Sequence, residues 1–449
     1  MSQATLLRRR EIIEALRRGT VPRRGLEQFA VGLSRFEQAI DLEIEAAAAG
    51  RGSFKAVRGD YGTGKTFFVR WLQHRARQLG FATAEVQISE NDTPLYRMET
   101  IYRRALEGLQ TQEWESGAFR ALIDRWFFTL EDEVISQGKV DQNNADAVAA
   151  QVGTLLEQRL ASISANHPQF AAALRGCHRA RTQGDLATAD GLLAWLMAQP
   201  NVSASIKGSA GLKGDVDHRG AGGFFRGLLA VLQQIGRKGL VLVLDEVETI
   251  QRVRADSREK SLNAIRQLID ELYDGRYPGL YVVITGTPQF FDGPQGVKRL
   301  PPLAQRLHVD FAADAKFDSA RAVQIRLQPF DTEKLCIVGM KVRDLYPTEH
   351  PERIASKVTD EVVRGLASSV VGRLGGKVGV APRVFLKRLV GDVLDRVEEH
   401  AEFNPTAHYN LALDPNELTP EERVAAGIER SVDDIELELR DKLVSNERS

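Results

Sequence analysis

An eight-residue segment, Gly59-Asp60-Tyr61-Gly62-Thr63-Gly64-Lys65-Thr66, constrains the possible folds of this chain more than any other feature. It fits the pattern G-x-x-x-x-G-K-[ST], in which glycines let backbone N–H groups curl around a diphosphate while the next helix contributes its positive N-terminus. A strand-like run, Phe54 to Arg58, precedes the loop, and a helical pattern, Phe67 to Leu79, follows it. This order of strand, phosphate-binding loop and helix predicts an α/β fold built on a parallel P-loop sheet.

The loop also predicts roles for its residues. Lys65 is expected to reach the β- and γ-phosphates of a nucleoside triphosphate, and the Thr66 hydroxyl to bind Mg²⁺. The preceding residues are expected to surround the phosphates with backbone N–H groups: Gly59, Asp60, Tyr61, Gly62, Thr63 and Gly64.

A second segment, Gly239 to Leu244 followed by Asp245 and Glu246, is typical of a buried strand that ends in two acids. Such an ending is costly unless the acids meet a cation or water. We expect Asp245 to hold Mg²⁺ through its water shell and Glu246 to act as general base on the water that attacks the γ-phosphate. Because the chain has no N-K-x-D guanine-reading motif, ATP is favoured over GTP.

A third segment, Leu280 to Thr285, is a further predicted strand, and Gly286-Thr287-Pro288 follows it. A hydroxyl group at this point could lie against the γ-phosphate or the attacking water, and the sequence does not separate Thr285 from Thr287 in this role. The alternative is an ordinary strand-to-turn sequence with no role in the site.

The remaining chain is mostly helical in pattern. Apolar residues at helical spacing predict helices over 5–19 and 26–48, then an almost wholly helical region from about 95 to 200. The stretch 201–224 is rich in Gly, Ser and Lys and is expected to be a mobile loop. We therefore expect four parts: N-terminal helices over 1–50, an α/β core over 51–330 that a large helical insertion at about 95–223 interrupts, a C-terminal helical lid over 331–400, and an acidic tail over 401–449.

The charge balance excludes a chain that binds polyanions through its overall charge, since 60 basic side chains accompany 61 acidic ones. The charge is uneven, however: residues 1–24 contain seven arginines and two glutamates, whereas residues 411–449 contain eleven acids and five bases. Three interpretations stay open: the two ends pair between subunits, the basic end contacts nucleic acid, or both are solvated helix faces. No apolar run approaches the ~18 residues of a membrane span, which favours a cytoplasmic location without membrane contact.

Taken together, these segments resemble the AAA+ ATPases, particularly the lineage of origin-recognition and related bacterial ATPases. The resemblance covers residues 20–90 and 224–400. It implies that Leu327 to Leu335 leads into the lid, and that Arg383 binds the γ-phosphate from the start of a lid helix. It also implies an adenine pocket near Val21, Pro22 and Arg35.

The same resemblance implies an arginine finger that a neighbouring subunit supplies, and hence a possible homo-oligomer. Arg306, which follows Pro301-Pro302-Leu303-Ala304-Gln305, is the first candidate. Three other arginines are alternatives: Arg299, Arg258 and Arg266.

More narrowly, several segments resemble the ATP-binding BrxD proteins of BREX phage-defence systems. They are Arg8 to Pro22, Phe54 to Thr66, Gln87 to Glu90 and Thr285 to Phe291. The resemblance extends over nearly the whole chain, including the helical insertion. It implies other BREX proteins as partners, among them a methyltransferase, a phosphatase-like protein and further ATPases.

Two classes of function follow. In the first, the chain is an ATPase whose Mg²⁺-dependent hydrolysis drives or gates assembly of a BREX defence complex. In the second, it is a slow or non-hydrolysing ATP-gated adaptor that binds partner proteins. Asp245 and Glu246 favour the first, while the large insertion and the lack of a DNA-reading motif favour the second, with DNA still a possible partner. A P-loop kinase is a third class, which a C-terminal lid disfavours.

Overall fold

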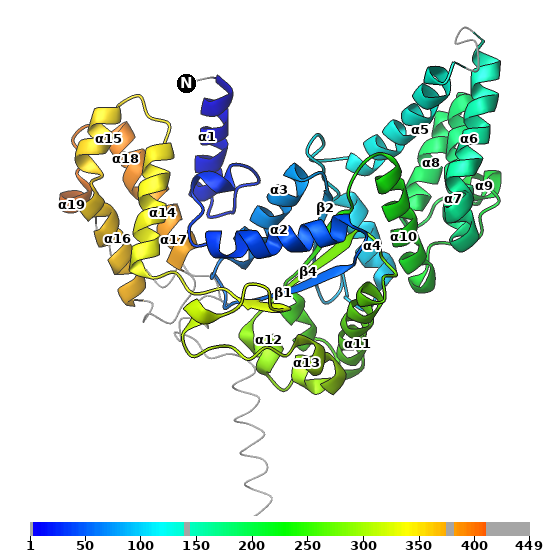
Figure 1. Cartoon of the computed structure of the whole chain (residues 1–449). Helices are drawn as coiled ribbons and strands as arrows, with labels where there is room; N and C mark the ends of the chain where they lie inside the picture. Colours follow the sequence, from blue (N-terminus) through cyan, green and yellow to red (C-terminus); the bar gives the residue numbers. More distant parts are fainter. Residues whose placement is uncertain (1–2, 139–143, 374–380, 410–449) are drawn as a thin grey trace, which may run out of the picture.

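A five-stranded parallel sheet forms the centre of the chain, in the order β2–β3–β4–β1–β5 (Figure 1). The computed structural model describes residues 3–138, 144–373 and 381–409. The predicted α/β fold with a parallel sheet is confirmed. The strands are β1 (Ser53–Arg58), β2 (Ala82–Gln87), β3 (Leu240–Asp245), β4 (Leu280–Gly286) and β5 (Gln324–Arg326).

The register of the sheet determines which loops meet at its carboxyl edge. Strand β4 lies between β1 and β3, pairing Val57 with Thr285 on one side and Ile284 with Leu244 on the other. The loop after β1, the end of β4 and the acids after β3 therefore lie at the same edge. In open parallel sheets this edge is where ligands bind.

Helices cover both faces of the sheet. Helices α2 (Ser34–Ala48) and α3 (Lys65–Gln78) pack on the face that carries Val241 and Val243. Helices α4 (Met98–Glu107), α10 (His218–Gln234) and α11 (Ala255–Tyr273) pack on the face that carries Leu240 and Leu242. Burial on both faces explains why these strands are apolar without alternation.

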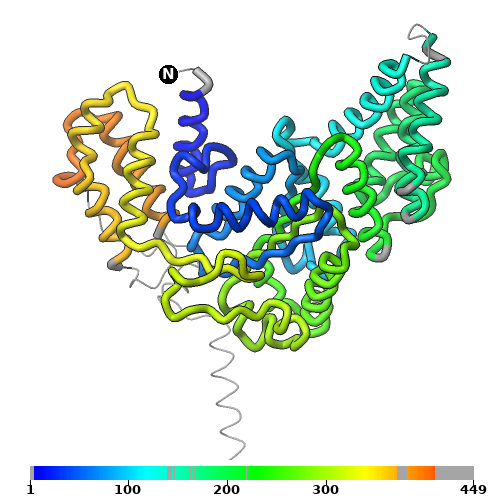
Figure 2. The backbone as a smooth tube through the Cα atoms, viewed as in Figure 1, coloured from blue at the N-terminus to red at the C-terminus, as the bar shows by residue number. Residues whose placement is uncertain are grey.

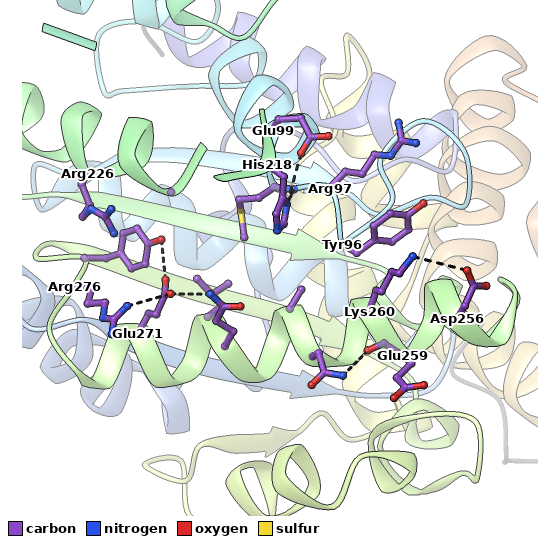
Figure 3. A pocket seen from close by; sticks show the side chains of 17 residues that line it. Tyr96, Arg97, Glu99, His218, Arg226, Asp256, Glu259, Lys260, Glu271 and Arg276 are labelled. Carbon is purple, nitrogen blue, oxygen red and sulfur yellow. Dashed lines mark hydrogen bonds and ion pairs between the residues drawn. The ribbon is translucent and has the colours of Figure 1, made fainter. Parts of the chain in front are cut away.

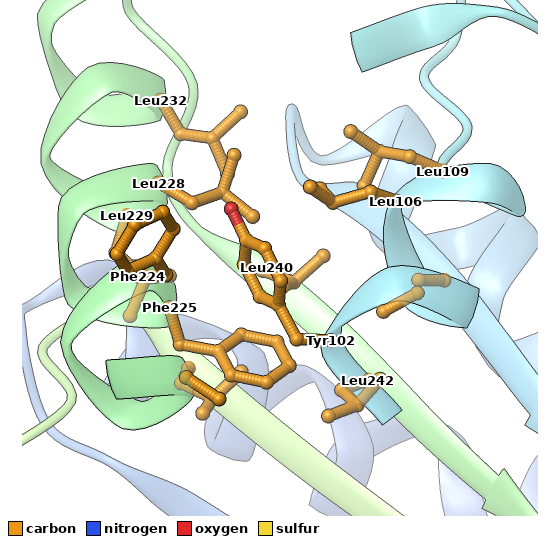
Figure 4. Packing of buried hydrophobic residues seen from close by; sticks show 14 of the residues in the cluster. Tyr102, Leu106, Leu109, Phe224, Phe225, Leu228, Leu229, Leu232, Leu240 and Leu242 are labelled. Atoms are coloured by element: carbon orange, nitrogen blue, oxygen red, sulfur yellow. The ribbon is translucent and has the colours of Figure 1, made fainter. Parts of the chain in front are cut away.

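The predicted helical insertion projects to one side of the sheet (Figure 1). Its root is an aromatic cluster in which Tyr102 of α4 meets Phe224 and Phe225 of α10, with ring centroids 5.9 and 4.9 Å apart (Figure 4). Trp126 Nε1 donates to Gln234 Oε1 at 2.9 Å, which ties the insertion to α10. The insertion helices are α5 (Ala118–Ser136), α6 (Ala145–Asn166), α7 (Pro168–Thr182), α8 (Leu186–Leu196) and α9 (Ala204–Ser209).

The prediction of a mobile loop over 201–224 is wrong in its early and last parts. Helix α9 forms there, and α10 begins at His218 and so crosses the expected boundary at 223. Its glycines are packing residues, since a Cβ on Gly223 would lie 2.6 Å from His167 and one on Gly227 would lie 2.7 Å from Phe170. Composition alone cannot distinguish such glycines from those of a linker.

The second predicted helix also begins later than expected. Helix α1 spans Gln3–Arg17, but the chain then makes only a short 3₁₀ turn at Leu26–Gln28 before α2 begins. Gly25 and Gly32 adopt left-handed conformations with φ of 73° and 77°, which interrupt the helical pattern.

The predicted lid is a bundle beside α1 (Figure 2). Arg17 of α1 binds Asp395 of the lid through two hydrogen bonds of 2.7 and 2.9 Å. The predicted acidic tail lies outside the described residues from residue 410 onward. The lid helices are α14 (Thr332–Leu345), α15 (Pro351–Lys357), α16 (Asp360–Arg373), α17 (Ala381–Arg388), α18 (Asp395–Glu399) and α19 (Pro405–His408), with a π-helical turn over Leu389–Leu394.

Two short helices complete the core, α12 (Pro288–Asp292) and α13 (Pro301–Leu307). Within the described ranges, none of the helices has both the length and the apolar character needed to cross a membrane.

Candidate nucleotide site

A cavity of about 420 Å³ lies where the loop after β1 meets the N-terminal segment and the lid. Its size falls within the range of small-molecule sites. Its wall combines four parts of the chain that are distant in sequence: residues 19–22 and 29–36, residues 61–67, the acids after β3, and lid residues such as Lys334 and Arg383.

The backbone of the loop requires its glycines. Gly62 and Gly64 have φ of 74° and 92°, in the left-handed region that side chains rarely adopt. A Cβ on Gly59 would lie 2.3 Å from the Thr63 hydroxyl, which itself donates to the Asp60 carbonyl at 2.8 Å. Gly64 caps α3, so the positive end of that helix faces the cavity.

Lys65 is folded back against its own loop and is only 8% exposed. Its Nζ donates to the carbonyl oxygens of Gly59 at 2.9 Å and Asp60 at 3.4 Å. The ammonium also lies 5.1 Å from the ring centroid of Tyr61 and 3.7 Å from a carboxylate oxygen of Glu248. Gly59 and Asp60 thus position the lysine, while Tyr61 through Thr66 line the cavity.

The two residues expected to bind Mg²⁺ lie side by side. The Thr66 hydroxyl donates to Asp245 Oδ2 at 3.3 Å. The other oxygen of Asp245 accepts from the Thr285 hydroxyl and, at 3.1 Å, from the backbone N–H of Glu246. One hydroxyl and one carboxylate fit Mg²⁺, which usually keeps several water molecules and takes phosphate oxygens as further ligands. No group of three or more His, Cys, Asp or Glu side chains that could hold a metal occurs in the described parts of the chain.

Glu246 has a strained backbone, with φ of 58° and ψ of 43°. A non-glycine residue in this region costs free energy that the surrounding structure must supply, and such residues cluster at functional sites. Its carboxylate lines the cavity and accepts a hydrogen bond of 2.9 Å from Gln87 Nε2, at the end of β2. The neighbouring strand β2 therefore orients the side chain of Glu246, the predicted general base.

The structure separates the two threonines that the sequence left equivalent. Thr285 is fully buried behind the acids, and its hydroxyl donates to Asp245 and accepts from the Glu246 N–H at 3.0 Å. Thr287 instead caps α12 by accepting from the Phe290 N–H at 3.4 Å. The cavity wall includes Asp245 and Glu246 but neither threonine.

The residues implied by resemblance fall into two groups. Val21, Pro22, Arg35 and Arg383 all line the cavity. The arginine-finger candidates do not line it and lie around α11 and α13: Arg306 and Arg266 bind Asp270 at 3.0 and 2.9 Å, Arg258 donates to the Val253 carbonyl at 2.8 Å, and Arg299 is exposed in a 3₁₀ turn.

Sequence reasoning missed Glu248, in the turn after β3. Its side chain lines the cavity and is 5% exposed, and neither carboxylate oxygen has a hydrogen-bond partner among the described residues. Burial raises its pKa from 4.5 to about 7; Lys65 and, more weakly, the residue's own backbone N–H oppose this rise, and Asp245 and Glu246 add to it. Glu248 follows Asp245 and Glu246 closely in the sequence, and this proximity was the only feature that could have indicated its place in the site.

A larger cleft of about 920 Å³ lies between α11 on one side and α4 and α10 on the other (Figure 3). Its charged groups are of both signs and are largely paired with one another: His218 lies 3.8 Å from Glu99, and Lys260 lies 3.9 Å from Asp256. None of the phosphate-loop residues lines it. The smaller cavity is therefore the stronger candidate for a nucleotide site.

Comparison with known proteins identifies the family of the chain. No curated protein matches the chain. A family model described as "BREX system ATP-binding protein BrxC/D" matches residues 6–412, from α1 through the lid and over the whole cavity wall. This match supports an ATP-binding role in a BREX system, and the chain belongs to the BrxC/D family of BREX ATP-binding proteins.

Proposed function

We propose that the chain is a BrxD-type, AAA+-like ATPase whose Mg²⁺-dependent hydrolysis of ATP drives or gates assembly of a BREX complex. The observation that carries this proposal is the meeting of Lys65, Thr66, Asp245 and Glu246 around one cavity. A chain that only bound ATP would need the phosphate loop but not a carboxylate oriented at the same edge of the sheet.

The residues divide the reaction between them. The loop N–H groups and Lys65 would bind the phosphates, while Thr66 and Asp245 would hold Mg²⁺, which would supply positive charge to the phosphate oxygens. Glu246, oriented by Gln87, would accept the proton of the water that attacks the γ-phosphorus. The bond from this phosphorus to the bridging oxygen would break, so that ADP is the leaving group and inorganic phosphate is the second product. Thr285 positions Asp245 and the Glu246 backbone rather than contacting phosphate, and Thr287 has the role of a helix cap.

Arg383 gives the lid its part in this proposal. It lines the cavity from α17, so a bound triphosphate would attract the lid toward the core. ATP occupancy would then set the position of the lid relative to the insertion and the sheet. We propose that partner proteins of the BREX system bind differently according to the position of the lid.

A specific observation also favours the ATP-gated adaptor as a second candidate. Arg306, the first candidate for a finger, is held by Asp270 and by the Pro302 carbonyl within its own chain. Reaching the site of a neighbouring subunit would require these bonds to break. Hydrolysis would then be slow until assembly releases an arginine.

The test is steady-state phosphate release from ATP by purified protein, with and without duplex DNA. Glu246→Gln should lower turnover by about a hundredfold or more while ATP still binds, and Lys65→Ala should abolish ATP binding. Glu259→Gln, which changes an exposed acid of the larger cleft, is the matched control and should leave turnover unchanged. Lys65-dependent binding without turnover in the wild-type protein would instead favour the adaptor.

A further inference from the structure

Glu248 is the acid that the reaction above does not use. It sits in the 3₁₀ turn Val247–Gln251, directly after the two acids of the site. A carboxylate hidden from water normally has hydrogen bonds or a close cation, because an uncompensated buried charge is costly. Neither oxygen of Glu248 has a hydrogen-bond partner among the described residues, so Lys65, at 3.7 Å, is the cation that compensates it.

The lysine that Glu248 faces is also the residue expected to bind phosphate. Lys65 has two carbonyl acceptors of its own, at 2.9 and 3.4 Å, and its contact with Glu248 is longer than a hydrogen bond. The contact is thus an electrostatic one that does not lock the lysine in place. Since Glu248 and Lys65 both line the cavity, a phosphate placed there would meet the same ammonium.

We propose that Glu248 is a positioning residue that competes with the phosphates of a bound nucleotide for Lys65. The inference rests on the proposed nucleotide site and adds to it a built-in counter-ion. When phosphate takes the lysine, Glu248 loses its compensating charge and comes to face a polyanion, and both changes oppose binding. Glu248 therefore weakens nucleotide affinity and makes release easier.

Affinity measurements test the competition directly. ATP and ADP binding is measured by calorimetry at about pH 8, where the carboxylate is ionised. Glu248→Gln should bind both nucleotides about tenfold more tightly than the wild-type protein, because the amide cannot compete for the ammonium. Glu333→Gln, which removes the same charge from the exposed first turn of α14, is the control and should leave affinity unchanged.

A double-mutant cycle tests the pair without any nucleotide. Lys65→Met should lower the urea midpoint of the wild-type protein, since it leaves Glu248 uncompensated, and should have a much smaller effect in the Glu248→Gln background. Equal effects in the two backgrounds would overturn the proposal. So would an unchanged or weaker nucleotide affinity of Glu248→Gln.

The outcomes separate this inference from the proposed function. A wild-type protein that binds neither ATP nor ADP would refute the nucleotide site, while the unfolding cycle would still report on the pair. If Glu248→Gln does not fold, Glu248→Met, a neutral side chain of similar length, replaces it in both measurements. Failure of both variants to fold would assign Glu248 a structural role and overturn the competition.

Discussion

Two lysine–glutamate pairs contain buried lysines that lie close together in the sequence, Lys55 and Lys65, and the pairs differ in how completely their polar groups are hydrogen-bonded. In the first, Lys55 of β1 contacts Glu43 at 2.5 Å and donates to the carbonyls of Ala320 and Ala322 at 3.2 and 2.6 Å. Glu43 also accepts from the Tyr281 hydroxyl at 2.5 Å. In the second pair, Lys65 meets Glu248 at 3.7 Å without a hydrogen bond to that carboxylate.

The difference follows from what surrounds each pair. Lys55 is fully buried in the sheet, and its pair with Glu43 joins α2, β1, β4 and the segment before β5, so the lysine has no ligand to exchange with. Lys65 and Glu248 line the cavity that we propose as the nucleotide site. A completely bonded pair stabilises one arrangement, whereas a loosely compensated pair leaves its cation available to phosphate.

The largest effect is expected from breaking the bonded pair. Lys55→Met leaves Glu43 partly buried without its cation and two carbonyls without a donor, so it should lower the free energy of unfolding by about 3–5 kcal/mol. Urea unfolding measures this loss. Lys298→Met, at an exposed position in the turn before α13, is the matched control and should change stability by less than about 0.5 kcal/mol.

The comparison fails if Lys55→Met lowers the free energy of unfolding no more than the control Lys298→Met does. It also fails if folded Lys55→Met protein loses nucleotide affinity, because the bonded pair is assigned no role at the cavity.

The loosely compensated pair should be visible as a pH dependence of stability. The unfolded chain loses the Glu248 proton near pH 4.5, whereas burial holds the pKa of the folded protein at about 7. Between these values the folded state binds more protons, so the free energy of unfolding should fall as pH rises, by up to roughly 3 kcal/mol in total. Urea unfolding between about pH 4.5 and 8 measures the slope.

The variant Glu248→Gln separates the contribution of Glu248 to this pH dependence from the contributions of other titrating groups. It removes the titrating group while Lys65, Asp245 and Glu246, the charged groups that face it, remain. The difference in stability between wild type and variant should therefore change across this pH window and be constant above it. A constant difference throughout would show that Glu248 is ionised in the folded protein across the whole window.

Local features of the sequence predicted the strands, the loop and the helix that surround this cavity. The phosphate loop and its flanking strand and helix are set by neighbouring residues, and so are the apolar strands that form the sheet. The acids after β3 could be assigned to the same edge because parallel strands align their carboxyl ends. The order of the strands then explains why Thr285, rather than Thr287, lies against Asp245.

Features that depend on tertiary packing could not be predicted in the same way. The glycines of α10 resemble a linker in composition, and only the rings of His167 and Phe170 show why small residues are needed there. In the sequence, Glu248 cannot be distinguished from an ordinary acidic residue in a turn. Only its burial and its distance from Lys65 distinguish it. The residue types of a site are therefore easier to predict from sequence than whether each buried polar group has a hydrogen-bond or ionic partner.

The smallest expected effect comes from an unsatisfied group that faces no ligand. The Tyr102 ring is fully buried between α4 and α10 (Figure 4), and its hydroxyl has no hydrogen-bond partner among the described residues. Tyr102→Phe should therefore stabilise the protein by about 1 kcal/mol, measured by urea unfolding, without changing nucleotide affinity. Tyr281→Phe, which removes a hydroxyl bonded to Glu43, should instead destabilise it by about 1–3 kcal/mol. Shifts of the same sign would mean that hydrogen-bond satisfaction does not distinguish these buried groups.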